Sequence, residues 1–108
     1  MGIDIEHLRE RVRRGKYLLR SHAVVHALKE GFDQKQIVEA ILNGKIVEEY
    51  PADQRLLICG SVPLEGDAFI YLHVVCEYAD DVYLEIITAY IPDELLWEHP
   101  PFRRRKQR

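Results

Sequence analysis

The stretch that decides the fold is "AFIYLHVVCEYADDVYLEIITAYIP", residues 68–92. Apolar side chains recur at every second position in both halves, and the turn-like "ADD" at 79–81 lies between the halves. A period of two interrupted by a short polar turn is typical of an antiparallel pair of strands. We therefore expect strands over residues 68–78 and 82–92.

The period of two continues upstream of this pair. "KIVEEYP" at 45–51 ends at a proline, and "RLLICGSV" at 55–62 follows the turn-like "PADQ". Both segments are short, apolar and separated by small or polar residues, which predicts two more strands. The short connections favour consecutive antiparallel neighbours.

Before residue 44 the apolar residues follow a helical period instead. Helices are expected over residues 4–14, 22–30 and 33–42, with "KYLLR" at 16–20 as a short strand between the first two. The expected N-caps are Asp4, Ser21 and Asp33, the last with Gln36 three residues on as in a capping box. Glycines or "NG" follow the helices and are typical stops.

This order predicts one α+β domain, residues 1–108, with a four- to five-stranded, mostly antiparallel sheet and two or three N-terminal helices packed on one face. Residues 1–15 form its amphipathic N-terminal helix, 16–101 its core and 102–108 a basic tail. A chain of 108 residues is long enough for one hydrophobic core and too short for two.

Side-chain parity then assigns the two faces of the sheet. One side carries Ala68, Ile70, Leu72, Val74 and Cys76, and continues with Val82, Leu84, Ile86, Thr88 and Tyr90. We expect this side to face the helices. The other carries Phe69, Tyr71, His73, Val75 and Glu77, with Tyr83, Glu85 and Ile87. It is expected to be uncovered, either as a functional surface or as an ordinary half-exposed sheet face.

The charge distribution is uneven. The formal net charge is −3, but residues 17–101 hold five basic and fifteen acidic residues. The basic residues gather at 9–16 and 103–108. Such ends can contact phosphate or an acidic partner, although a solvated helix face and a solubilising tail would have the same composition. No signal peptide or apolar stretch of membrane-spanning length is visible, so a cytoplasmic protein without membrane contact is expected.

His22 and His26 lie four positions apart on one expected helix face, with Lys29 beside them. This spacing suits a metal pair, but zinc needs a third protein ligand and Lys29 opposes a cation. Cys59 and Cys76 are sixteen residues apart in apolar runs and are expected to be small buried hydrophobic residues. No metal or other cofactor is predicted. His22 remains a candidate for acid–base chemistry at a helix N-terminus.

Several blocks together resemble the bacterial family called domain of unknown function 4258. They are "YLLRSHAVVHALKEGFDQKQIVEAILNGKIVEEYPADQRLLICG", "YLHVVCE", "LEIITAYIPDELLW" and "FRRR", within residues 16–105. The pattern is also similar to BrnT and RelE-like toxins, small α+β proteins that cleave RNA without a metal and are blocked by an antitoxin. The chain departs from the pattern at His26 and Glu30, where relatives tend to carry arginine.

The resemblance implies a toxin-like domain, either a metal-independent endoribonuclease or an inactive descendant. RNA cleavage by 2′-hydroxyl attack needs a base, an acid and a cation near the phosphate. The expected catalytic residues are His73 and Glu85, with His22 as a second candidate. Tyr71 and Tyr83 are expected to stack bases, and Arg103, Arg104 and Arg105 to supply positive charge.

Two other functions are compatible with the same sequence. The acidic body suits a non-catalytic module that binds an antitoxin or regulatory protein, and an exposed aromatic face suits a structural homodimer. Trp97 can either hold the C-terminal residues onto the sheet or line a partner-binding groove. RNA, a protein partner and a second copy of the chain therefore all remain expected partners.

Overall fold

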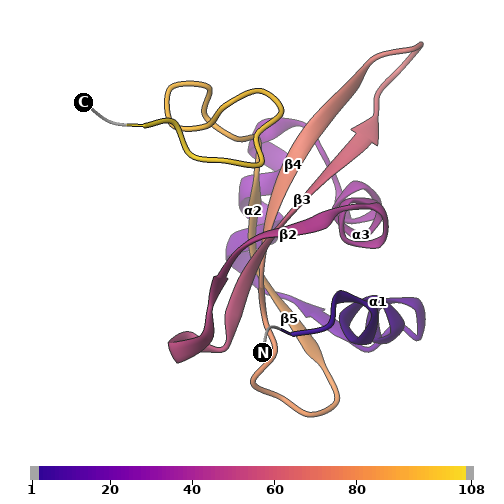
Figure 1. Cartoon of the computed structure of the whole chain (residues 1–108). Helices are drawn as coiled ribbons and strands as arrows, with labels where there is room; N and C mark the ends of the chain where they lie inside the picture. Colours follow the sequence, from indigo (N-terminus) through magenta and orange to yellow (C-terminus); the bar gives the residue numbers. More distant parts are fainter. Residues whose placement is uncertain (1–2, 107–108) are drawn as a thin grey trace.

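The computed structural model describes residues 3–106, which fold into a five-stranded sheet with three α-helices packed against it (Figure 1). The elements are α1 (Ile5–Arg13), β1 (Tyr17–Leu19), α2 (Ser21–Glu30), α3 (Gln34–Asn43), β2 (Lys45–Tyr50), the 3₁₀ turn η1 (Pro51–Asp53), β3 (Arg55–Pro63), β4 (Phe69–Glu77) and β5 (Leu84–Tyr90). The predicted α+β class is confirmed.

The strand order is β1-β5-β4-β3-β2, and β2 to β5 form the predicted antiparallel meander. The β4–β5 pair decides the fold as expected, with Val74 opposite Ala89. Strand β1 adds to the free edge of β5 in parallel, with Tyr17 opposite Leu84. The sheet is therefore mixed, and its parallel pair is joined through α2, α3 and the meander.

The helix boundaries follow from capping chemistry. Asp4 accepts a hydrogen bond from the Glu6 N–H, and Asp33 forms the predicted reciprocal capping box with Gln36. Gly31 ends α2 in the left-handed conformation with a φ of 85°. The expectation for Ser21 is wrong, because α2 begins one residue earlier than predicted and its N-cap is Arg20, which makes no side-chain cap bond.

The core lies between the helices and one face of the sheet. Its sheet side has Leu72 and Val74 of β4 beside Leu84 and Ile86 of β5, all fully buried, as parity predicts. Val82 was expected to continue this row, but β5 begins at Leu84 and Val82 is exposed.

Helix α3 lies very close to β3. A Cβ atom added at Gly60 would meet the Ala40 backbone at 2.3 Å, so glycine is required for this approach.

A β-bulge in β5 changes which side chains share a face. Val75 pairs with Thr88 and Cys76 pairs with Ile86, so Ile87 has no partner on β4. Beyond the bulge Ala89 is buried against the helices, and Tyr90 lies on the opposite face, directly across from His73. The parity prediction that placed Thr88 and Tyr90 toward the helices is therefore wrong.

The far face of the sheet was expected to be uncovered, and this is wrong for the part around His73. Residues 91–106, here called the C-terminal segment, fold back over it as a compact loop (Figure 1). Trp97 and Arg104 form an isolated β-bridge within this loop. Beneath it His73, Leu57 and Cys59 are almost completely buried, although all three belong to the face opposite the helices.

Candidate functional site

The candidate site centres on His73 of β4, where the C-terminal segment meets the sheet. The imidazole has no exposed surface, and its Nε2 lies 2.8 Å from the Pro101 carbonyl oxygen. The indole of Trp97 contacts the ring edge-to-face at 4.4 Å between centroids, and Tyr90 does so at 5.4 Å. His73 is thus held on three sides by groups distant in the sequence.

The hydrogen bond determines the protonation of His73. A carbonyl only accepts, so Nε2 carries a proton, and in the neutral ring Nδ1 is the bare nitrogen. Within residues 3–106, Nδ1 is the buried side-chain polar atom that has no hydrogen-bond partner. Burial lowers the pKa of His73, although the Pro101 carbonyl and Glu48 favour the charged form. The ring is therefore neutral near pH 7.

Beside His73, the segment is fixed by a bidentate ion pair. Arg104 donates to Glu48 from Nε at 2.7 Å and from Nη2 at 3.0 Å, and its guanidinium lies 4.7 Å from the centre of the Trp97 ring. The Tyr50 hydroxyl also donates to Glu48. The bond from Arg104 is the main cause of the lowered pKa of Glu48, and Glu48 in turn raises the pKa of Arg104.

Glu48 and Tyr50 were not among the predicted site residues. A bulge in β2, between Ile46 and Glu48, turns Glu48 toward the face that holds His73. The sequence "KIVEEYP" indicates a strand but not the bulge, so the face of Glu48 could not be assigned. The carboxylate of the site comes from the edge strand rather than from β5.

Glu85 and Tyr83 lie at the other end of the sheet. Glu85 pairs in register with Glu77, four residues along β4 from His73, which corresponds to roughly 13 Å. Its carboxylate accepts from Arg20 at 2.6 Å, and this bond is the main cause of its lowered pKa. His73 and Glu85 are therefore not brought together as an acid–base pair.

His22 lies on the exposed start of α2, stacked on His26 with ring centroids 6.1 Å apart. His26 donates from Nδ1 to the Ala89 carbonyl at 2.7 Å, and Glu30 accepts from the Ile91 N–H at 2.8 Å. His26 and Glu30, where relatives tend to carry arginine, thus attach α2 to the end of β5. His22 is not in contact with His73, since His26 and Tyr90 lie between them.

Tyr71 is the centre of an aromatic cluster next to the candidate site. Its ring makes edge contacts with Phe69, His99 and Phe102 at 5.4 to 5.9 Å, and Lys45 lies 3.8 Å from the centre of the Phe102 ring. A groove of about 410 Å³, here called the aromatic groove, opens between this cluster and the C-terminal segment; its walls include Phe69, Tyr71, Ile91, Trp97, His99 and Arg105.

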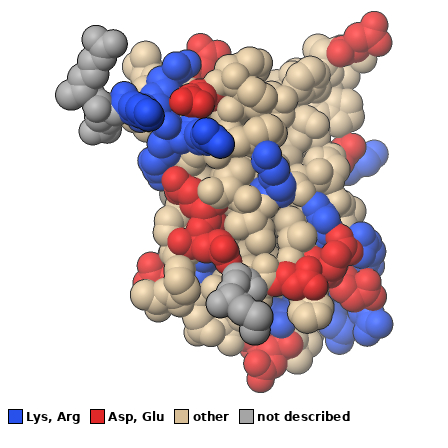
Figure 2. All heavy atoms as spheres, viewed as in Figure 1, with Lys and Arg blue, Asp and Glu red and all other residues tan. Residues whose placement is uncertain are grey.

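Arg103, Arg104 and Arg105 come to this end of the molecule with Lys106, and all four side chains are exposed. Figure 2 shows the corresponding basic group at the upper left. Arg104 is occupied by Glu48, and Arg105 donates from Nε to the Glu94 carbonyl at 2.6 Å. Of the predicted arginines, Arg105 lines the aromatic groove together with Tyr71, and Tyr83 is not among the groove residues.

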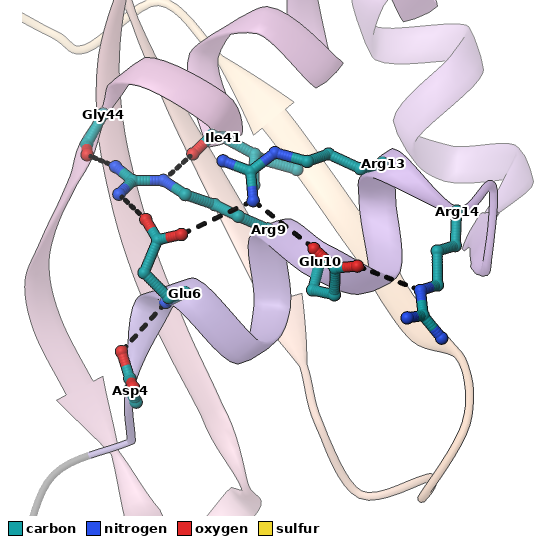
Figure 3. A network of polar contacts seen from close by, with 8 residues as sticks. All are labelled: Asp4, Glu6, Arg9, Glu10, Arg13, Arg14, Ile41 and Gly44. Atoms are coloured by element: carbon teal, nitrogen blue, oxygen red, sulfur yellow. Dashed lines mark hydrogen bonds and ion pairs between the residues drawn. The ribbon is translucent and has the colours of Figure 1, made fainter.

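The basic residues at 9–16 are occupied mainly by ion pairs and backbone contacts within the fold (Figure 3). Arg9 pairs with Glu6 at 2.7 Å and also donates to the Ile41 and Gly44 carbonyls at the end of α3. Arg13 and Arg14 pair with acidic residues of the same helix. This arrangement is an ion-paired helix face that also stabilises the C-terminus of α3.

No group of three metal-ligating side chains is assembled anywhere in residues 3–106. Cys59 and Cys76 are free and buried, and burial raises the pKa of both thiols to about 12. Neither thiol is a reactive nucleophile in this environment. None of the helices described is long and apolar enough to cross a membrane.

A family model described as "Domain of unknown function (DUF4258)" matches residues 19–91, well over half of the sequence. The chain belongs to this family. The match begins at Leu19, the last residue of β1, and ends just after β5, so the DUF4258 region comprises α2, α3 and the strands β2 to β5. Helix α1 and most of the C-terminal segment lie outside it. Searches of the curated proteins and of the solved structures found no match.

Proposed function

We propose that this DUF4258 protein is a cytoplasmic, toxin-like protein that acts on single-stranded RNA. The observation that carries the proposal is the position of Arg105 in the wall of the aromatic groove, with the exposed Arg103 and Lys106 close to it in the chain. Proteins that bind single strands combine cationic side chains along the backbone path with aromatic rings for the bases. Tyr71 and the C-terminal arginines supply both kinds of group, as the family resemblance leads us to expect.

Cleavage would use the groups where the C-terminal segment meets the sheet. His73 is the candidate base or acid, Arg104 is the cation for the phosphate, and Glu48 replaces Glu85 as the nearby carboxylate. In the described arrangement His73 is buried and Arg104 is bound to Glu48. Metal-independent endoribonuclease activity therefore requires the C-terminal segment to move. A descendant that kept RNA binding and lost cleavage is the other form of the same proposal.

The test compares the half-buried Tyr71 at the groove with the exposed Tyr83. The purified chain, Tyr71→Ala and Tyr83→Ala are incubated with a labelled single-stranded RNA in EDTA, and binding is followed by anisotropy and cleavage on a gel. Loss of one stacking tyrosine should weaken binding about 10-fold for Tyr71→Ala, while Tyr83→Ala, roughly 20 Å away along the sheet, should bind as the wild type does. Absence of binding by the wild type at moderate salt would refute the proposal.

A second candidate function, binding of an antitoxin or regulatory protein, is favoured by α2. Val24, Val25 and Leu28 on this helix are 43%, 51% and 71% exposed. Exposed apolar residues grouped on one helix are typical of a partner-binding surface, and a second copy of the chain could occupy it. Light scattering of the wild type and of Leu28→Glu distinguishes self-association from binding of a different protein. A dimer that is lost in the variant indicates self-association. A monomer in both cases indicates that the surface binds a different protein.

A further inference from the structure

We propose that the aromatic groove is a guanine-base site within a single strand of RNA. This inference rests on the proposed function and adds the base that the surface selects. It is carried by three properties of the groove: its size and aromatic walls, the two carboxylates that line it, and the guanidinium that lines it with them.

The dimensions suit one nucleotide. Small-ligand sites begin at roughly 300 Å³, so a groove of about 410 Å³ is at the lower end of that range. Phe69 is 55% exposed and Ile91 is 42% exposed, so the mouth of the groove is apolar and open. Trp97 is buried as its floor, and the Tyr71 ring stands at its side. A base that entered would cover these apolar surfaces and stack against a ring.

The carboxylates decide which base enters. Glu94 and Glu98 line the groove, and across residues 3–106 neither side chain takes part in an ion pair. A carboxylate only accepts hydrogen bonds. Guanine presents two neighbouring donors on its Watson–Crick edge, N1–H and the N2 amino group, which can bind both oxygens of one carboxylate. Adenine presents a bare N1 at the same place, and a carboxylate repels it.

Arg105 completes the site. Its Nε donates to the Glu94 carbonyl, which fixes the guanidinium at the groove. Within residues 3–106 its terminal nitrogens donate to no side chain. Those nitrogens can donate to the guanine O6 or to the adjoining phosphate. The positive charge also offsets the repulsion between the RNA backbone and the two carboxylates. The groove therefore reads a base with donors on one edge and an acceptor beside them.

The test uses the single tryptophan of the chain, Trp97, as the reporter. Pentauridylates with a central guanine or a central adenine are titrated separately, following Trp97 fluorescence and, with labelled oligonucleotides, anisotropy. We expect the guanine oligonucleotide to bind about 10-fold more tightly, corresponding to about 1.4 kcal/mol. The ratio of the two affinities is compared between variants, because removal of negative charge raises affinity for both oligonucleotides.

In Glu94→Ala/Glu98→Ala the ratio should fall to about 1, a loss of the whole 10-fold preference. The control is Glu39→Ala, on α3 at the opposite face of the sheet, which should keep the wild-type ratio. Equal affinity of the wild type for guanine and adenine, or a preference that survives in the double variant, would overturn the guanine site while RNA binding stands. Absence of RNA binding altogether would overturn the proposed function and this inference with it.

Discussion

The Nε2–H of His73 donates to the Pro101 carbonyl across 2.8 Å and joins the centre of β4 to a loop 28 residues further along the chain. Trp97 packs on the same imidazole, and Arg104 reaches past it to Glu48. Within residues 91–106, no backbone–backbone hydrogen bond joins this loop to β2, β3 or β4. The C-terminal segment is therefore attached to the sheet through a small number of side chains.

Loss of the His73 ring should therefore destabilise the protein. His73→Ala removes a buried hydrogen bond and leaves a cavity under Trp97, and we expect the free energy of unfolding to fall by about 2–4 kcal/mol. Urea denaturation followed by tryptophan fluorescence measures this, with emission shifted to the red in the folded variant. The exposed His22→Ala serves as control and should lie within about 0.5 kcal/mol of the wild type. A His73→Ala variant as stable as that control would contradict the account.

The buried imidazole also predicts a pH dependence. The pKa of His73 is lowered in the folded chain by burial, while the ordinary value of 6.5 applies when it is unfolded. Between those two values the unfolded state binds a proton that the folded state does not, so stability is complete above pH 6.5 and decreases as the pH falls toward the folded pKa. Arg104 opposes protonation of the ring and Glu48 favours it, and both keep their charge above pH 5.

Urea denaturation at pH 5, 6, 7 and 8 tests this dependence. His73→Gln keeps an N–H that can donate to Pro101 but does not titrate, so its free energy of unfolding should change less between pH 7 and pH 5 than that of the wild type. Parallel curves for the two proteins would show that His73 does not cause the decrease.

The contact between α3 and β3 gives a sharp steric prediction. In Gly60→Ala the added methyl group would lie 2.3 to 2.8 Å from Ala40 backbone atoms, and backbone cannot move aside as a side chain can. We expect a loss of about 3 kcal/mol or failure to fold. Gly66→Ala is the control, since its Cβ meets nothing within 4 Å and only the positive φ of 72° is unfavourable. Equal stability of the two variants would exclude the close helix–strand approach.

The elements and their order could be predicted from the sequence because they depend on local patterns. The change from a helical period to a period of two at residue 44, and the caps at Asp4 and Asp33, are visible without a structure. Inward residues of β4 such as Leu72 were also placed correctly. These signals are local, and each is repeated over several positions.

The candidate site could be predicted only in part. The bulge at Ile87 leaves no mark in the alternation "LEIITAY", so Tyr90 was assigned to the wrong face. The fold-back of the C-terminal segment depends on the contact of Trp97 with His73 of β4, which no local pattern in the sequence indicates. The partnership of Arg104 with Glu48 spans 56 residues and has no local pattern.

The Arg104–Glu48 ion pair should affect the local opening of the C-terminal segment more than the stability of the whole fold. Arg104→Ala removes a pair with one partner largely exposed, so we expect only about 0.5–1 kcal/mol of lost stability. Amide hydrogen exchange in residues 93–105 should nevertheless become faster, because local opening requires less free energy. Arg103→Ala is the matched control and should leave that exchange unchanged. If amide exchange in residues 93–105 were similar in both variants, the Arg104–Glu48 ion pair would not be what holds the segment on the sheet.

The central claim, that the C-terminal segment builds an RNA-binding surface, is tested most directly by the salt dependence of RNA binding. The logarithm of the association constant for a labelled single strand is measured against the logarithm of the salt concentration for the wild type, Arg103→Ala/Arg105→Ala and the α1 control Arg13→Ala/Arg14→Ala. Each phosphate contact on a single strand contributes about 0.7 to this slope, so the C-terminal variant should lose about 1.4 and the control nothing. An unchanged slope in the C-terminal variant, or an equal loss in both, would contradict the claim.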